Sequence, residues 1–170
     1  PVPAGKPEPV EPDKSNVDTT KKLHCTISID CATILNNLSD LDPAKLDVLP
    51  TDGVVLGAVT VEFSEGESVF DVLQRVCREN NIHLEATFTP GYNSAYVEGI
   101  HNLYEFDCGA LSGWMYRVNG WFPNYGCSRY AVQAGDVIEW MYSLGWRPPE
   151  QEEESLPVVP LAGNAKETSP

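Results

Sequence analysis

Apolar and polar residues alternate along several stretches of the chain, and this is the pattern of half-buried β-strands. Residues 23–31 and 54–63 show it clearly, residues 82–88 and 94–100 more weakly, and residues 137–144 close the series. Asn119-Gly120 separates two apolar runs, and this pair favours the type I′ turn of a β-hairpin. The pattern predicts a hairpin with one strand over residues 114–118 and the other starting at Trp121 and Phe122.

One segment has the period of an amphipathic helix. Ser68 can accept hydrogen bonds from the first-turn amides, and Asp71 completes a Ser-x-x-Asp capping box. The apolar stripe that follows consists of Val69, Leu73, Val76 and Cys77. Shorter helices are expected at residues 32–38 and 43–49, the second of them capped by Asp42. Strands on both sides of one main helix predict an α+β domain, with a mostly antiparallel sheet in the ubiquitin-like β-grasp arrangement.

The ends of the chain differ in composition from its centre. Ten of the 14 prolines lie outside residues 23–146, and both ends lack hydrophobic periodicity. Such segments bury too little apolar surface to offset the entropy of ordering. We therefore expect disordered linkers at residues 1–22 and 147–170 and one folded domain at residues 23–146. Linkers on both sides are typical of a module within a longer string of domains.

Three motifs in this order resemble the transcobalamin C-terminal-like domain family. The motifs are Gly66-Glu67-Ser68-Val69, Gly113-Trp114-Met115-Tyr116 before Asn119-Gly120, and Gly135-Asp136-Val137-Ile138-Glu139-Trp140. The resemblance covers residues 54–143. It implies a β-grasp domain of the kind found in vertebrate cobalamin carriers and in secreted multidomain proteins of Gram-positive bacteria. It also implies an extracellular or cell-wall location.

The resemblance makes cobalamin a candidate cofactor. In the vertebrate carriers this domain closes over a corrinoid that a separate α-helical barrel holds, and these 170 residues contain no such barrel. A corrinoid role would therefore need a neighbouring domain or partner. The positions expected to face the corrinoid lie around Trp114, Tyr116 and Trp140.

Charge excludes several classes of partner. The formal net charge is −14, and residues 23–146 carry −11 of it. A domain this acidic repels phosphate backbones and anionic lipid surfaces, so we expect no nucleic acid and no membrane insertion. No apolar run approaches the ~20 residues that a membrane helix requires. Small molecules, glycans and neighbouring domains remain as partners of a monomeric module.

Cysteine and histidine leave two interpretations open. Five cysteines allow one structural disulfide, with Cys108 and Cys127 flanking the predicted hairpin, or they are buried free thiols. Thiolates and imidazoles also bind zinc, although the sequence has no C-x-x-C or H-x-x-x-H spacing. The candidate metal ligands are Cys25, Cys31, Cys108, Cys127, His24 and His101.

The sequence does not favour catalysis. No serine or cysteine stands in a recognisable nucleophile–base motif, and Glu105 with Asp107 is a carboxylate pair of the kind that is usually solvated. The dense aromatic residues of the hairpin and last strand favour a binding role if part of their surface is accessible. The predicted ligand contacts are Trp114, Tyr116, Trp121, Phe122, Tyr125, Trp140 and Tyr142. We therefore expect a non-catalytic binding module, with metal-binding and carbohydrate or adhesion modules as alternatives.

Overall fold

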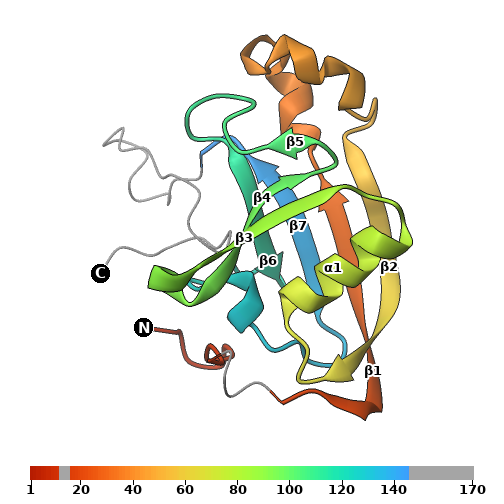
Figure 1. The fold of residues 1–170 in the computed structure, drawn as a ribbon, viewed down its shortest axis with the longest axis vertical. Helices are drawn as coiled ribbons and strands as arrows, with labels where there is room; N and C mark the ends of the chain where they lie inside the picture. The colour runs from red at the N-terminus through yellow and green to blue at the C-terminus, as the bar shows by residue number, and fades with distance from the viewer. Residues whose placement is uncertain (12–15, 146–170) are drawn as a thin grey trace.

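A four-stranded sheet forms one layer of the molecule (Figure 1). The computed structural model describes residues 1–11 and 16–145, so the predicted linker at 147–170 lies outside the described residues. The strands are β1 (Asp18–Asp30), β2 (Val54–Glu65), β6 (Gly113–Val118) and β7 (Val137–Ser143), in the order β2-β1-β7-β6. β1 is antiparallel to β2 and parallel to β7, and β6 is antiparallel to β7. β1 begins at Asp18, inside the segment for which a linker is expected.

A second layer covers one face of this sheet. It consists of helix α1 (Val69–Glu79) and a smaller antiparallel sheet of β3 (Leu84–Thr89), β4 (Ser94–Ile100) and β5 (Leu103–Tyr104). In Figure 1 the helix lies across the lower part of the large sheet and the small sheet across its upper part. The core between the layers includes Ile27 and Ile29 of β1, Leu73 of α1 and Val97 of β4. The predicted mixture of strands with one main helix is confirmed.

The start of α1 follows from the Ser-x-x-Asp motif. Ser68 Oγ accepts the amide of Asp71 at 3.1 Å, and the Asp71 carboxylate accepts the amide of Ser68 at 2.9 Å. These two bonds satisfy amides that have no partner within the helix, which is the action of a capping box. The apolar stripe is buried at Val69, Val72, Leu73, Val76 and Cys77.

The two short helices expected at residues 32–38 and 43–49 do not form as α-helices. The segment instead forms three 3₁₀ helices at Ala32–Asn36, Leu38–Asp40 and Pro43–Val48. Asn37 has φ −140 and ψ 34, which interrupts the first run before an α-helical turn can continue. Asp42 does cap the last segment, accepting the amide of Ala44 at 3.0 Å.

The Asn119-Gly120 turn is confirmed, but the hairpin around it is not. Asn119 (φ 53) and Gly120 (φ 80) both have the positive φ of a type I′ turn. Beyond the turn only one bridge forms, between Val118 and Trp121, and β6 pairs with β7 instead. Asn119 directs this pairing, because its side chain donates to Asp136 (2.9 Å) and accepts the amide of Val137 (2.8 Å).

Candidate functional site

Most of the aromatic residues predicted to contact a ligand lie inside the molecule. The four on the inward faces of β6 and β7 are 0% exposed: Trp114, Tyr116, Trp140 and Tyr142. Tyr125 is 7% exposed, and only Trp121 and Phe122 are partly accessible. The alternation of β6 and β7 was predicted correctly, but their aromatic face meets the second layer and forms core. A ligand role stays a prediction for these residues, and the accessible surface available for it belongs to Trp121 and Phe122.

The buried aromatic residues hold two surface segments in place. The Trp114 indole donates to the Leu103 carbonyl at 2.8 Å, and the Tyr142 hydroxyl donates to the Tyr104 carbonyl at 2.7 Å. Both acceptors lie in β5, where residues 101–112 begin to cross the surface. We call residues 101–112 the propped loop. The Tyr116 hydroxyl similarly donates to the carbonyl of Tyr125, at 2.8 Å, in the segment after the turn.

Backbone conformation marks the propped loop as unusual. His101 (φ 55), Asn102 (φ 58) and Phe106 (φ 70) are non-glycine residues in the left-handed region. At His101 and Asn102 positive φ is the ordinary geometry of a two-residue hairpin turn, because Ile100 pairs with Leu103 on either side of them. At Phe106 it is rare, and such residues cluster at binding and catalytic sites, where surrounding contacts hold them. Phe106 is 55% exposed, and its amide donates to the Ser112 carbonyl at 2.9 Å. The fold therefore presents an apolar ring to solvent on a restrained backbone.

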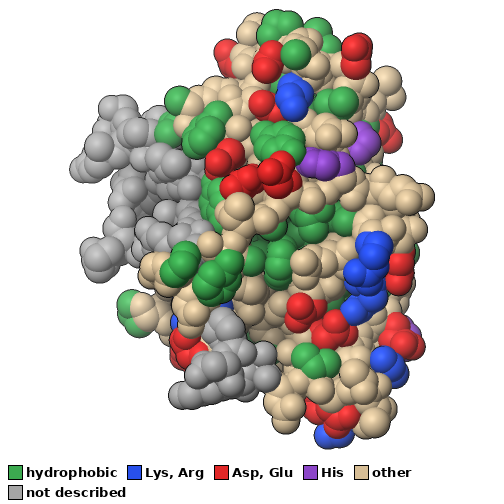
Figure 2. Space-filling view, in the orientation of Figure 1, with side chains coloured by type: hydrophobic (Ala, Val, Ile, Leu, Met, Phe, Trp, Pro, Cys, Tyr) green, Lys and Arg blue, Asp and Glu red, His purple; other side chains and the backbone are tan. Residues whose placement is uncertain are grey.

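Carboxylates gather beside this loop on the outward face of the small sheet. We call Glu85, Glu98, Glu105, Tyr96 and Tyr104 the acidic face. The Tyr96 hydroxyl donates to Glu105, the Tyr104 hydroxyl donates to Glu85, and Thr87 Oγ1 donates to Glu98 at 3.1 Å. Figure 2 shows acidic and histidine side chains close together on this side of the molecule. Each carboxylate has about four lone-pair sites, so it can accept further hydrogen bonds from a ligand.

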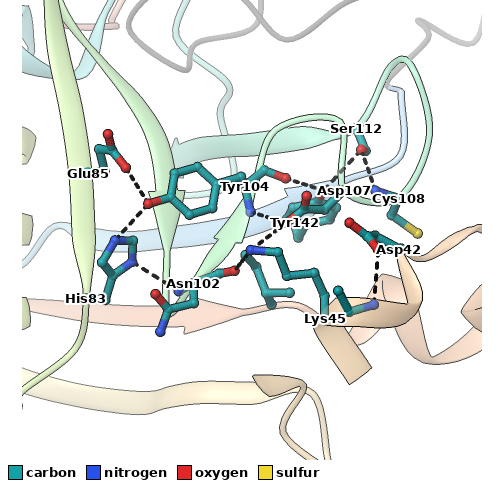
Figure 3. Close-up of polar contacts among 12 residues, drawn as sticks. Asp42, Lys45, His83, Glu85, Asn102, Tyr104, Asp107, Cys108, Ser112 and Tyr142 are labelled. Atoms are coloured by element: carbon teal, nitrogen blue, oxygen red, sulfur yellow. Dashed lines mark hydrogen bonds and ion pairs between the residues drawn. The ribbon is translucent and has the colours of Figure 1, made fainter. Parts of the chain in front are cut away.

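A chain of polar contacts orders one side of the acidic face (Figure 3). His83 Nδ1 accepts the Asn102 amide at 3.0 Å, and Nε2 lies 2.9 Å from the Tyr104 hydroxyl, which also bonds Glu85. Because Nδ1 accepts, Nε2 carries the proton and donates to Tyr104. The bond to Glu85, together with burial, raises the pKa of Tyr104 to about 12. Tyr104 is therefore a neutral phenol at physiological pH.

Lys45 fixes the other side of Tyr104. Its ammonium lies 4.9 Å from the centre of the Tyr104 ring, donates to the Asn102 carbonyl at 2.7 Å and lies 3.5 Å from Asp107. These contacts connect the 3₁₀ helix Pro43–Val48 to the propped loop, as Figure 3 shows. The ring is thus held between a cation and the sheet.

Gly99 makes room for the Tyr104 ring. A Cβ built at residue 99 would lie 2.8 Å from Cδ2 of Tyr104, well inside van der Waals contact. Gly99 pairs with both Glu85 and Tyr104 in the small sheet, so the ring crosses the sheet directly over this glycine. Sequence alone shows the glycine but not the ring above it.

A groove lies between α1 and the edge strand β3. It has a volume of about 360 Å³ and is lined by Phe70, Gln74, Leu84, Ala86, Thr87, Phe88 and Ala95. Phe88 is 58% exposed. Figure 2 shows apolar side chains gathered in the middle of this face, below the acidic ones. Apolar surface next to ordered polar groups is the usual composition of a small-molecule site.

The cysteines form no disulfide among the described residues, and all five thiols are buried. Burial raises the pKa of Cys25 to about 11 and of Cys31 and Cys77 to about 12. It also raises the pKa of Cys108 and Cys127. Neutral, buried thiols are poor nucleophiles and poor metal ligands.

The candidate metal ligands do not come together. Within residues 1–11 and 16–145, no group of three or more His, Cys, Asp or Glu side chains is arranged to hold a metal ion. Cys108 Sγ contacts the Asn37 carbonyl at 3.7 Å, and Cys127 Sγ contacts the Ala95 carbonyl at 3.8 Å. Cys25 and Cys31 are 1% and 0% exposed, whereas His24 is exposed on the same strand as Cys25. His101 lies in the propped loop. Metal binding by these residues therefore has no geometric support.

The chain is similar to one protein family in sequence and to solved structures in fold. Residues 66–143 match a family described as DUF4430, a domain of unknown function. Haptocorrin in complex with Cbi has a similar structure, with a TM-score of 0.52 and 15% sequence identity over 77% of this chain and 27% of that chain. A protein from Ruminococcus gnavus, described as a "putative metal binding protein", aligns with a TM-score of 0.43 and 15% identity over 73% of this chain and 99% of that one. No curated protein matches the chain.

The similarity to haptocorrin supports a shared fold. At 15% identity the similarity to haptocorrin concerns the fold, and this chain spans 27% of haptocorrin's length. The family match covers the capping box, the turn and the last strand, which carry the resemblance seen in the sequence. None of the described helices is long and apolar enough to span a membrane.

Proposed function

We propose that this chain is a non-catalytic module that binds a ligand at the acidic face and the propped loop. One observation carries the proposal. Phe106, a bulky non-glycine residue, is held in the left-handed conformation with its ring 55% exposed, beside the exposed carboxylate of Glu85 and the half-buried carboxylates of Glu98 and Glu105. Buried side chains of β6 and β7 hold the adjoining backbone from below. Strain maintained in this way is expected at a binding site, because it fixes the ligand contacts before binding.

The chemistry of the surface limits the class of ligand. Carboxylates accept hydrogen bonds and repel anions, so the ligand is neutral or cationic and rich in N–H or O–H donors. Phe106 and Phe88 add exposed apolar surface at 55% and 58% exposure. A corrinoid, with amide side chains around a large ring, has both properties. Resemblance to the transcobalamin family and the fold shared with haptocorrin make it the specific candidate.

The fold supports a module that works with a second domain. The order β2-β1-β7-β6, with a parallel central pair and a helix across one face, is the topology on which we base the β-grasp assignment. A β-grasp domain of this family covers a ligand that another domain holds. We therefore place the chain in a longer extracellular protein, attached to the surface of a Gram-positive bacterium and monomeric in itself.

Calorimetric titration of the full chain with cobinamide tests the proposal. We expect weak binding, with a dissociation constant of about 1 mM, because only part of the site is present. Glu98→Gln should weaken it about 5-fold, the effect of losing about 1 kcal/mol from one hydrogen bond. Glu62→Gln removes an equal charge from exposed β2, away from the site, and should leave the affinity unchanged.

The alternatives give different results in the same assay. Zn²⁺ and a mucin-type glycan, titrated separately, test the metal-binding and carbohydrate functions. Binding of the glycan but not of cobinamide would replace the corrinoid while leaving the site in place. If neither cobinamide nor the glycan produces heat, or if Glu98→Gln and Glu62→Gln weaken binding equally, the acidic face is not the binding surface.

A further inference from the structure

The N-terminal segment contacts the folded domain, although its composition predicts a linker. Residues 1–11 form no helix or strand. Ala4 and Gly5 form a turn in which the Lys6 amide donates to the Pro3 carbonyl at 3.1 Å and Gly5 has φ 83. The following residues, Lys6 to Glu11, read Lys-Pro-Glu-Pro-Val-Glu. They cross the surface formed by the segment after the Asn119-Gly120 turn.

Four features of the surface match four features of this segment. Lys6 Nζ lies over the Trp121 ring, 5.6 Å from its centre. The Tyr125 hydroxyl donates to the Pro7 carbonyl at 2.6 Å, and the Arg129 carbonyl accepts the Val10 amide at 2.8 Å. The Glu11 carboxylate accepts from Arg129 Nη2 at 2.6 Å and from Asn93 Nδ2 at 2.5 Å. A cation, a carbonyl, an amide and a carboxylate are each recognised in order along the chain.

Packed aromatic rings form the base of this surface. Trp121 and Tyr125 meet edge to face at 6.1 Å, and Tyr125 stacks on Tyr130 at 6.1 Å with 19° between the planes. Tyr130 in turn meets Tyr116 of the core. Rows of aromatic rings with a hydrogen-bond donor at their edge are the way proline-rich segments in the polyproline II conformation are bound. Such segments lose little conformational entropy on binding.

The segment does not fill the space available to it. A cavity of about 180 Å³ remains beside Val10, and its lining includes Ser68, Ser128 and Arg129. Arg129 Nε is buried and has no hydrogen-bond partner among the described residues. The site therefore has room for more ligand than the segment supplies.

We propose that the surface formed by Trp121, Tyr125, Arg129 and Asn93 is a binding site for proline-rich segments of the type Lys-Pro-x-Pro-x-Glu. Residues 6–11 occupy it in cis, and the ligand in trans is a segment of the same chemistry on another polypeptide. The chain itself contains a second basic-proline-acidic segment, Arg147-Pro148-Pro149-Glu150, so this composition recurs in it. This site is separate from the acidic face and does not depend on the ligand bound there.

The test uses the full chain and a synthetic peptide of residues 1–11. A double variant combines Val10→Pro with Glu11→Ala. It removes the amide donor and the carboxylate from the cis segment and leaves the sequence of the folded domain unchanged. Glu8→Ala is the matched control, since it changes the charge equally at an exposed residue that makes no hydrogen bond to this surface in the described structure. Peptide binding is followed by ¹H–¹⁵N NMR at the Trp121 indole and the Arg129 amide.

We expect saturable shifts at Trp121 and Arg129 in the double variant. In the Glu8→Ala control the same peptide should bind at least about 10-fold more weakly, because a tethered ligand competes at millimolar effective concentration. A peptide with Ala in place of Glu11 should also bind the double variant more weakly, by about 5-fold or more. Unmoved Trp121 and Arg129 signals in the double variant, or equal binding of both peptides, would overturn the proposal.

A second measurement needs no variant. Hydrogen exchange of the Val10 amide in the unmodified chain should be slowed by its bond to Arg129, and excess peptide should accelerate it by displacing the cis segment. Exchange as fast as in a free peptide, or exchange that saturating peptide leaves unchanged, would contradict the proposal.

Discussion

Tyr142→Phe tests whether the buried aromatic residues position the propped loop. The substitution removes one oxygen atom and keeps the ring, which is 0% exposed and packs edge to face on Trp114 at 5.3 Å. The lost hydroxyl donates to the Tyr104 carbonyl at 2.7 Å and lies 3.0 Å from Ser112 Oγ. The Tyr104 carbonyl keeps one other donor, the Asp107 amide at 3.2 Å. We therefore expect a loss of about 1–2 kcal/mol in the free energy of unfolding, below the full penalty for an unsatisfied buried acceptor.

Tyr116→Phe is the matched control. Tyr116 lies on the same aromatic face and is equally buried, but its hydroxyl donates to the Tyr125 carbonyl, away from the propped loop. Chemical denaturation should give both variants similar losses of stability with an unchanged m-value. Hydrogen exchange should separate them. The Phe106 amide, bonded to the Ser112 carbonyl, should exchange up to about 10-fold faster in Tyr142→Phe alone, which corresponds to about 1.4 kcal/mol.

Two results would refute this reasoning. A loss of stability below about 0.5 kcal/mol would mean that the Tyr142 hydroxyl does not support the loop. Equal acceleration of Phe106 exchange in both variants would mean that the loop responds to general destabilisation of the core and not to the contact beneath it.

Two further predictions concern single side chains. Gly99→Ala places a methyl group against Tyr104 and should separate the phenol from Glu85. The Tyr104 pKa should then fall from about 12 toward 10.0, the ordinary value for tyrosine, as absorbance during alkaline titration would show. An unchanged titration would disprove the contact. Burial alone would raise the pKa of Glu67, but hydrogen bonds from Arg75 (2.6 Å) and the Ser64 amide (2.6 Å) lower it below 4.5. Glu67 therefore stabilises the fold above pH 4.5, and this stability is lost as pH falls through the lower folded pKa. Glu67→Gln should lower the free energy of unfolding by about 1–3 kcal/mol at pH 7. Denaturation measured across pH should also show a weaker dependence of stability on pH below 4.5. An unchanged acid profile would exclude Glu67 as the source of that dependence.

Local signals in the sequence predicted the local structure. The Ser68 and Asp71 capping box and the Asn119-Gly120 turn each depend on residues within a few positions, so they are readable without tertiary information. The helix stripe and the alternation of β1 are likewise local and correct. The partner of β6 is not local, because Asn119 directs it to β7 through Asp136 and Val137. The expected short helices are divided into separate 3₁₀ segments, because Asn37 ends the first run and Leu41 is extended before the last one.

Periodicity identified the aromatic face but not its surroundings. Trp114, Tyr116, Trp140 and Tyr142 share a face as expected, yet whether that face meets solvent depends on α1 and the small sheet covering it. The propped loop was missed because its signal is weak in sequence. His101-Asn102 and Gly109 are compatible with left-handed backbone, but the contacts that hold the loop come from residues distant in sequence. His83 and Lys45 bond the Asn102 backbone, and Trp114 and Tyr142 bond the carbonyls of β5.

Amide chemical-shift mapping of the full chain during a cobinamide titration tests the central claim most directly. The account predicts the largest shifts on the small sheet and the propped loop, at Tyr96, Tyr104 and Phe106, with Trp121 and Phe122 unaffected. Shifts centred on Trp121 and Phe122, with the acidic face unmoved, would contradict it.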